Sequence, residues 1–155
     1  CVAANDNSDG QVVLSGAMSA IDRAVEIASE FGARKCVKLA VSAPFHSPFM
    51  QPAAEAMARA FMNVEANNAE IPLIANVLAA PITNHKEIIK HLIEQVTGTV
   101  RWRETMAYLQ EQGVTDFVEL GAGKVLSGIA KRSHKEMNAF SVGSVEDIEE
   151  LAKNL

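Results

Sequence analysis

Strand-like and helix-like segments alternate along this chain, and this alternation constrains its fold more than any other feature. Short apolar or alternating runs indicate strands, and apolar residues at helical spacing indicate helices between them. Such an order favours an α/β fold with a mainly parallel sheet. The expected strands cover residues 1–4, 11–15, 36–41, 71–77, 116–120 and 139–142, and the expected helices cover 19–31, 48–64, 84–97, 103–112, 124–132 and 145 onward.

Residues typical of helix ends support several of these boundaries. Pairs of a capping residue and an acidic residue three positions later indicate helix starts, and glycine after an apolar run indicates a stop. The expected caps are Ser19 with Asp22, Asn84 with Glu87, and Ser144 with Asp147, and the expected stops are Gly32 and Gly113. In the helix at 48–64, an apolar stripe of Phe49, Ala53, Met57 and Phe61 is expected to face the core.

The composition is that of an ordinary globular protein, with 48% hydrophobic and 21% charged residues. No apolar run approaches the roughly 20 residues needed to cross a bilayer, so no membrane partner is expected and the chain is predicted to be cytoplasmic. The net charge of −5 and the scattered cations argue against nucleic acid as a partner. Cys1 and Cys36 are expected to be reduced thiols. Because a strand-like run begins at Cys1, we expect the chain to be part of a longer protein.

His46 lies at a junction that is chemically unusual. It follows the strand-like run at 36–41, it stands between Pro44 and Pro48, and Ser47 with Pro48 is typical of a helix start. The positive end of a helix dipole disfavours an imidazolium, which suits a general base. A structural or surface histidine is the alternative that this pattern alone leaves open.

Other candidate motifs fit poorly. Residues 121–124 resemble part of a phosphate loop, but Val118 and Val125 stand where that motif needs glycine and a hydroxyl residue. We therefore expect a tight strand-to-helix turn there. No metal site is expected, because the histidines lack ligand spacing; His85, His91 and His134 are expected to be solvated. A Gly-x-Ser-x-Gly nucleophile motif does not occur in the 155 residues.

Four segments in order resemble one enzyme family over nearly the whole chain. They are residues 5–16, the run 41–50 around Phe45 and His46, the segment 95–102 that ends in Val-Arg-Trp, and the segment 119–126 with its Glu-Leu-Gly-Ala-Gly-Lys sequence. Together they are similar to the C-terminal half of the malonyl-CoA:acyl carrier protein transacylases.

The resemblance implies a particular architecture. It predicts a partial α/β-hydrolase-like core joined to part of a ferredoxin-like subdomain. Residues 1–42 would be the later part of that small subdomain, and residues 43–155 would be the C-terminal half of the acyltransferase core. The N-terminal half, which is expected to be missing, would carry the nucleophilic serine, an arginine for the malonyl carboxylate and a glutamine of the oxyanion loop.

The resemblance also implies roles for five residues. His46 would be the catalytic base, and the backbone carbonyl of Gln95, at an expected helix end, would hold the other imidazole nitrogen. Phe45 before the histidine would favour malonyl over methylmalonyl groups, although Pro44 stands where the family often has alanine; core packing is the alternative for Phe45. Asn5 and Asn7 would line the pantetheine channel, with a role in the hairpin turn as an equal alternative.

The implied reaction is malonyl transfer from coenzyme A to the phosphopantetheine thiol of acyl carrier protein through a serine-bound malonyl group, in fatty-acid biosynthesis. The chain alone is expected to be inactive, and the intact enzyme is expected to be a monomer that uses malonyl-CoA as substrate without a cofactor. Three alternatives stay open: a noncatalytic fragment that binds acyl carrier protein or coenzyme A, an acyltransferase domain of a polyketide synthase, and an unrelated ferredoxin-like binding module followed by helices.

Overall fold

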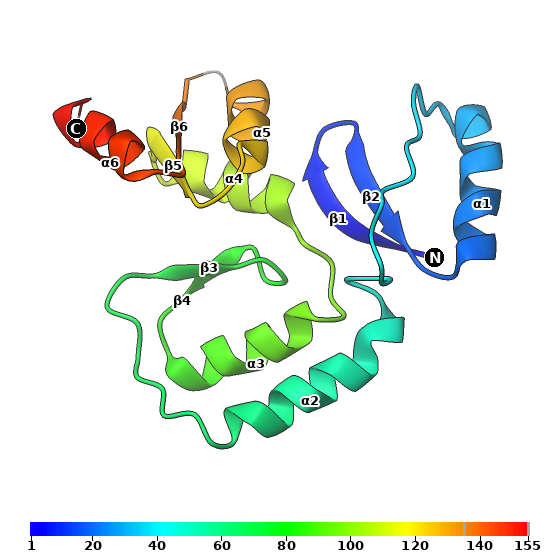
Figure 1. Ribbon diagram of the computed structural model, residues 1–155, viewed down its shortest axis with the longest axis horizontal. Helices are drawn as coiled ribbons and strands as arrows, with labels where there is room; N and C mark the ends of the chain where they lie inside the picture. Colours follow the sequence, from blue (N-terminus) through cyan, green and yellow to red (C-terminus); the bar gives the residue numbers. More distant parts are fainter. Residues whose placement is uncertain (135, 155) are drawn as a thin grey trace. The chain divides into compact units, whose positions relative to one another are not determined.

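The computed structural model describes residues 1–134 and 136–154, without the side chain of Asn154, and over these residues the chain is a mixed α/β protein (Figure 1). It forms two compact units. The first comprises residues 1–7 and 11–102, and the second comprises residues 8–10 and the chain from Arg103 onward. The predicted boundary between residues 42 and 43 concerns a different division of the chain and stays a prediction.

The first unit contains two hairpins and the helices that follow them. Its elements are β1 (Val2–Ser8), β2 (Gln11–Ser15), α1 (Met18–Ile27), a 3-10 turn (Ala28–Phe31), a second 3-10 turn (Pro48–Met50), α2 (Gln51–Phe61), β3 (Leu73–Ala75), β4 (Ala80–Ile82) and α3 (His85–Gln95). β1 pairs with β2, β3 pairs antiparallel with β4, and α2 packs against α3. The strand expected at 71–77 is thus shorter, and β4 is a strand that the sequence analysis missed.

The first two strands were expected at residues 1–4 and 11–15, which would leave residues 5–10 for the hairpin turn, and this prediction is wrong. β1 continues to Ser8, and only Asp9 and Gly10 form the turn, with Gly10 in a left-handed conformation at φ 78°. The polar residues of β1 are held extended because the amide of Asp6 donates to Val100 and the carbonyl of Ala4 accepts from Val100. Backbone pairing on this second edge outweighs their low strand propensity.

The strand expected at residues 36–41 does not form. The segment is irregular, and its apolar side chains Val37, Leu39 and Val41 are 58–64% exposed. An alternating pattern places side chains on two faces, but a strand also needs a neighbouring edge that pairs its backbone groups. None of the described strands supplies one here.

Two expectations about the helices also fail. α1 begins at Met18 after Ala17, without a side-chain cap, and the carboxylate of Asp22 instead forms an ion pair with Lys38, so Ser19 and Asp22 are not a capping box. In α2 the buried residue is Ala54. The predicted core stripe is largely exposed, with Phe49 at 63% and Met57 at 38%, because no described element covers that face.

Other helix signals are confirmed. Gly32 ends the 3-10 turn after α1 at φ 85°. The side chain of Asn84 accepts hydrogen bonds from the amides of Lys86 and Glu87 at the start of α3. Gly113 follows α4 (Trp102–Glu111) in a left-handed conformation at φ 77°.

The second unit matches the sequence analysis closely. Its elements are α4 (Trp102–Glu111), β5 (Asp116–Leu120), α5 (Val125–Ser133), β6 (Asn138–Val142) and α6 (Val145–Asn154). The predicted capping box before α6 is present, because the Asp147 amide bonds the Ser144 hydroxyl and the Ser144 amide bonds the Asp147 carboxylate. The amide of Gly143 also donates to that carboxylate, and these bonds lower the pKa of Asp147.

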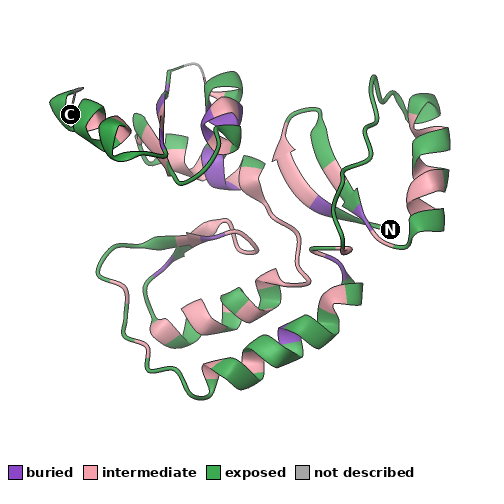
Figure 2. Cartoon of the chain, in the orientation of Figure 1, coloured by how far each residue is buried: buried purple, intermediate pink, exposed green. Residues whose placement is uncertain are grey.

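A mainly parallel sheet was expected, and the described strands correct this prediction. β5 and β6 are parallel neighbours with Asp116 opposite Asn138 and Leu120 opposite Val142, whereas the other described strands form the separate sheets of the two hairpins. α5 connects the two parallel strands and packs against both. Buried residues gather along α5 and β6 (Figure 2), and Met106 of α4 is also buried, at 1% exposed.

Among the described residues, no helix has both the length and the apolar character that crossing a membrane requires.

Glu119 of β5 caps α5. Its carboxylate oxygens accept hydrogen bonds from the backbone amides of Ser127 at 2.8 Å and Leu126 at 3.1 Å. These bonds lower the pKa of Glu119 below the ordinary 4.5, and the bond from Ser127 has the largest effect. As the pH falls, the Glu119 carboxylate is therefore protonated at a higher pH in the unfolded chain than in the folded one. The contribution of Glu119 to stability is complete above about pH 4.5 and is lost as the pH falls through the lowered folded value.

We expect Glu119→Gln to reduce the free energy of unfolding at neutral pH and to weaken its dependence on pH below about 4.5. Part of the dependence will remain, because the pKa values of Asp116 and Asp147 are also lowered. Urea denaturation between pH 3 and pH 7 measures both effects, with Glu119→Asp, a shorter carboxylate, as the matched control. An unchanged slope in the glutamine variant would contradict the prediction.

Candidate functional site

His46 lies at a sharp corner that precedes α2. Its backbone is left-handed, with φ of 55°, which is uncommon for a residue other than glycine and concentrates at functional sites. Pro48 begins the 3-10 turn that leads into α2, as predicted. The hydroxyl of Ser47 does not cap that turn; it donates to the carbonyl of Pro44 at 2.6 Å.

The imidazole of His46 meets the end of α3. Its Nδ1 lies 3.0 Å from the backbone carbonyl oxygen of Gln95, a residue 49 positions later in the chain. This carbonyl is available because the amides that follow α3 bond to Ile93 and Glu94 instead. When Nδ1–H donates to it, the lone pair of the neutral ring is on Nε2. A base with this tautomer can accept a proton through Nε2.

The side chain of Gln95 approaches the same ring nitrogen. Its Nε2 is 3.0 Å from Nδ1 of His46 and 3.3 Å from the carbonyl oxygen of Gly98. An amide N–H and a carbonyl oxygen cannot both bond to one imidazole nitrogen in one tautomer. The amide has the Gly98 carbonyl as another acceptor, so we assign the bond at Nδ1 to the backbone carbonyl of Gln95.

The segment after Gln95 is bound on two sides. The hydroxyl of Thr99 donates to Ala3 at 2.7 Å, and Val100 forms a parallel bridge with Asn5 of β1. The guanidinium of Arg101 donates to the carbonyls of Val77 and Leu78 in the turn between β3 and β4. These bonds fix the position of the Gln95 carbonyl relative to both hairpins of the first unit.

The structure places the other predicted site residues as follows. Asn5 and Asn7 lie in β1 rather than in a turn, and as residues i and i+2 of a strand they share a face. Asn5 is beside Val100, close in the chain to Gln95. Phe45 adjoins His46 and is 47% exposed, so it does not serve as core packing in this chain.

The remaining histidines lie at helix ends or on a helix face, and each has a side-chain partner; the prediction that they are solvated is wrong for His91 alone. Nδ1 of His85 contacts Asn68 at 2.9 Å, and that of His134 contacts Gln110 at 2.7 Å. His91 contacts Glu94, and its side chain is only 13% exposed. Within residues 1–134 and 136–154, no cluster of three or more potential metal ligands occurs.

The glycine loop before α5 forms a tight turn, with Gly121 at φ 125° and Gly123 at φ 101°. The α5 amides that would face a phosphate are bonded to the carboxylate of Glu119. An anion that belongs to the protein thus occupies the helix N-terminus. The sequence analysis did not predict this role, because Glu119 lies seven positions before the first amide that it caps.

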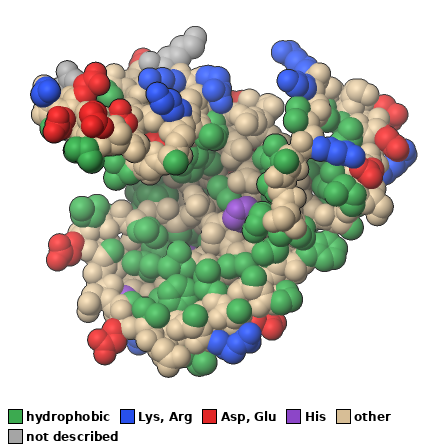
Figure 3. Space-filling view, viewed as in Figure 1, with side chains coloured by type: hydrophobic (Ala, Val, Ile, Leu, Met, Phe, Trp, Pro, Cys, Tyr) green, Lys and Arg blue, Asp and Glu red, His purple; other side chains and the backbone are tan. Residues whose placement is uncertain are grey.

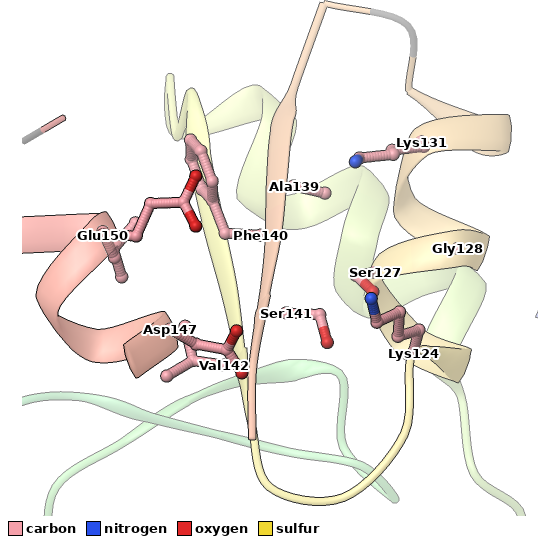
Figure 4. Close-up of a pocket in the computed structure, with 11 residues that line it drawn as sticks. Lys124, Ser127, Gly128, Lys131, Ala139, Phe140, Ser141, Val142, Asp147 and Glu150 are labelled. Atoms are coloured by element: carbon pink, nitrogen blue, oxygen red, sulfur yellow. The ribbon is translucent and has the colours of Figure 1, made fainter. Parts of the chain in front are cut away.

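One hollow of the described structure lies in the second unit and contains none of the predicted site residues. Its volume is about 500 Å³, and it borders β6 between α5 and α6. Lys124 and Lys131 lie on the α5 side, and Asp147 and Glu150 lie on the α6 side (Figure 4). A smaller hollow of about 130 Å³ in the first unit is lined by β3 and α3 and includes Gln95.

Comparison with known proteins identifies the family. Residues 1–152 match the model of the acyl transferase domain. The chain belongs to the acyl transferase domain family. The chain spans about half the length of the curated relatives that it matches; one, a malonyl CoA-acyl carrier protein transacylase of Synechocystis, is 41% identical over 97% of this chain and 50% of its own length.

Solved structures agree with this assignment. An acyl-carrier-protein S-malonyltransferase from Bartonella henselae is 47% identical, with a TM-score of 0.93 over 99% of this chain and 49% of the other. A malonyl-transacylase solved with its type II polyketide synthase acyl-carrier protein is 33% identical, with a TM-score of 0.93 over 99% of this chain and 50% of the other. The mixed α/β fold of this chain is thus that of half of such an acyltransferase.

Gly98 lets the Gln95 turn pack closely. A Cβ at this position would lie 2.8 Å from Cγ1 of Val77 and 2.9 Å from the carbonyl oxygen of Glu94. We expect Gly98→Ala to cost about 1–3 kcal/mol of stability, as overpacking does, and to displace the Gln95 carbonyl from His46. Chemical denaturation and the imidazole NMR signals of His46 measure the two effects.

Gly128→Ala is the matched control for this prediction. A Cβ there meets only the end of the Arg132 side chain at 3.4 Å, and the position is inside α5. Alanine is about 1 kcal/mol better than glycine in a helix interior, so this variant should gain stability. A Gly98→Ala chain as stable as the wild type would show that the turn has room for a side chain.

Proposed function

We propose that this chain is part of a malonyl-CoA:acyl carrier protein transacylase, with His46 as its general base. The observation that carries the proposal is the contact between Nδ1 of His46 and the Gln95 carbonyl at a strained corner. The contact leaves Nε2 as the proton acceptor. The names of the relatives supply the substrate class, because they act as malonyl CoA-acyl carrier protein transacylases.

The proposed reaction has two steps. Nε2 of His46 takes the proton of a serine hydroxyl while the oxygen attacks the thioester of malonyl-CoA, and the proton leaves on the thiol of coenzyme A. The phosphopantetheine thiol of acyl carrier protein then attacks the serine ester, and its proton passes through His46 back to the serine. The serine would come from residues outside these 155, since a nucleophile elbow does not occur among them.

A further observation supports a covering segment next to His46. Phe45 and Phe49 flank the corner and are 47% and 63% exposed. Apolar side chains are spread over the face of the first unit that carries α2 and α3 (Figure 3). Exposed apolar surface of this kind marks a place where another segment binds. We propose that the N-terminal half of the enzyme, which carries the serine, packs there.

The finer architecture is part of the same proposal. Residues 1–42, with the β1–β2 hairpin and α1, would be the later part of a ferredoxin-like subdomain. Residues 43–155 would be the C-terminal half of an α/β-hydrolase-like core. Asn5 and Asn7 would line the pantetheine channel, since both lie on β1, which is bonded to the segment after Gln95.

Acyl carrier protein is the proposed macromolecular partner, supported by the related malonyl-transacylase solved with its type II polyketide synthase carrier protein. A noncatalytic fragment that binds acyl carrier protein or coenzyme A is the second candidate, because these residues include no nucleophile elbow. Binding of acyl carrier protein to the isolated chain, measured by calorimetry, would favour this second candidate if the assembled enzyme shows no transfer.

In the enzyme assembled with its N-terminal half, we expect His46→Ala to lower malonyl transfer about 10²–10⁴-fold, the usual contribution of a general base. Transfer of radiolabelled malonyl from coenzyme A to acyl carrier protein is the assay. His134→Ala, a histidine bonded to Gln110 in the second unit, is the matched control and should retain activity. Full transfer by His46→Ala would exclude His46 as the base.

Phe45 is expected to limit the size of the acyl group. Replacing it with serine should raise the kcat/KM for methylmalonyl-CoA relative to malonyl-CoA about 10-fold or more, since one methyl group in such a pocket is worth about 1–3 kcal/mol. Competition between the two thioesters measures this ratio. Phe49→Ser, at an exposed position of the same segment, is the control. If the ratio of kcat/KM for the two thioesters changed equally in both variants, a specific role of Phe45 in selectivity would be excluded.

A further inference from the structure

Ser47 is unusual among the polar residues of the described structure. It is 0% exposed, so its hydroxyl has no access to water. A buried hydroxyl is unfavourable unless it is hydrogen-bonded, and this one donates to the carbonyl oxygen of Pro44 at 2.6 Å. The bond closes a turn that contains Phe45 and His46.

The closed turn holds His46 in a backbone conformation that it would otherwise rarely adopt. Its φ of 55° lies in the left-handed region, which few residues other than glycine adopt. Strained conformations persist only when the surrounding structure fixes them. The bond from Ser47 to Pro44 supplies a constraint that spans the strained residue.

Ser47 also connects this turn to the start of the helix. Its carbonyl accepts the amide of Met50 at 3.0 Å, and Pro48 fixes the next backbone torsion. The hydroxyl therefore connects the corner to a rigid element on one side of His46. On the other side the imidazole must reach the Gln95 carbonyl, so a small rotation at residue 46 would break the 3.0 Å contact.

We propose that Ser47 is a positioning residue, which holds His46 in its left-handed conformation and so keeps Nδ1 bonded to Gln95 and Nε2 free to accept a proton. The inference rests on the proposed role of His46 as the base. Ser47 acts only through the backbone of His46, because its hydroxyl is buried and its proton is engaged by Pro44.

The test measures the tautomer of His46 in the enzyme assembled with its N-terminal half, by long-range ¹⁵N–¹H NMR of labelled histidine. In the wild type we expect the Nδ1–H form. In Ser47→Ala we expect a mixture of the Nδ1–H and Nε2–H forms, because the ring is no longer aimed at Gln95. A Ser47→Ala chain that is folded and keeps the wild-type tautomer would overturn the proposal.

Two further variants make the test specific. Ser127→Ala removes another buried serine, 4% exposed and in α5 of the second unit, and should leave the His46 tautomer unchanged. If it shifts the tautomer as much as Ser47→Ala, the effect is general destabilisation and the proposal fails. Ser47→Gly also removes the hydroxyl donor without adding bulk, and it decides the question by the same criterion if Ser47→Ala does not fold.

Activity separates this inference from the proposed function. In the assembled enzyme, Ser47→Ala should lower kcat about 10-fold or more with little change in KM for malonyl-CoA, since it removes no substrate contact. A loss confined to KM would contradict a positioning role. If His46→Ala retains full transfer, the proposed function fails. The tautomer measurement would still decide separately whether Ser47 positions the imidazole of His46.

Discussion

The contact between the imidazole of His46 and the carbonyl of Gln95 is the constraint on which the candidate site depends. It joins two segments that are 49 residues apart, and each needs its own support. On the histidine side that support is the turn closed by Ser47. On the glutamine side it is the end of α3 and the segment up to Arg101, which is bonded to β1 and to the turn after β3. The alternation of hairpins and helices in the first unit thus places one carbonyl oxygen against one ring nitrogen.

The two units differ in how completely they bury their own apolar residues. In the second unit, Met106, Ile129 and Ala139 are at most 4% exposed, and α5 packs against both parallel strands. In the first unit the buried apolar residues are mostly alanines, such as Ala4 and Ala54, while Met57 of α2 and the flanking Phe49 and Met62 are exposed. A helix stripe has no energetic reason to exist without a partner surface, because burial is what stabilises it. The exposed apolar pattern of the first unit is therefore the physical basis for proposing that another segment covers this face.

This difference explains how much could be predicted from sequence. Features that depend on near neighbours were predicted correctly: the bounds of β5, the Ser144 and Asp147 box, the Asn84 cap and the Gly113 stop. Features that depend on distant pairing were not. Residues 36–41 alternate as a strand does but have no paired edge, and β1 extends to Ser8 only because Val100 binds its backbone. His46 could be identified as a candidate from its position, whereas its φ of 55° and the Ser47 bond have no local sequence signal.

The choice of a carbonyl as the partner of Nδ1 has a chemical consequence for such a base. A carboxylate in that position would stabilise the imidazolium strongly, whereas a neutral carbonyl selects the tautomer with a smaller preference for the charged ring. The arrangement then depends on geometry more than on charge, since a neutral hydrogen bond is weaker than a charge-assisted one and tolerates less misalignment before it is lost. A neutral partner therefore requires a rigid backbone on both sides of the bond. The strained residue, the buried serine and the bound segment after α3 are the features that meet this requirement.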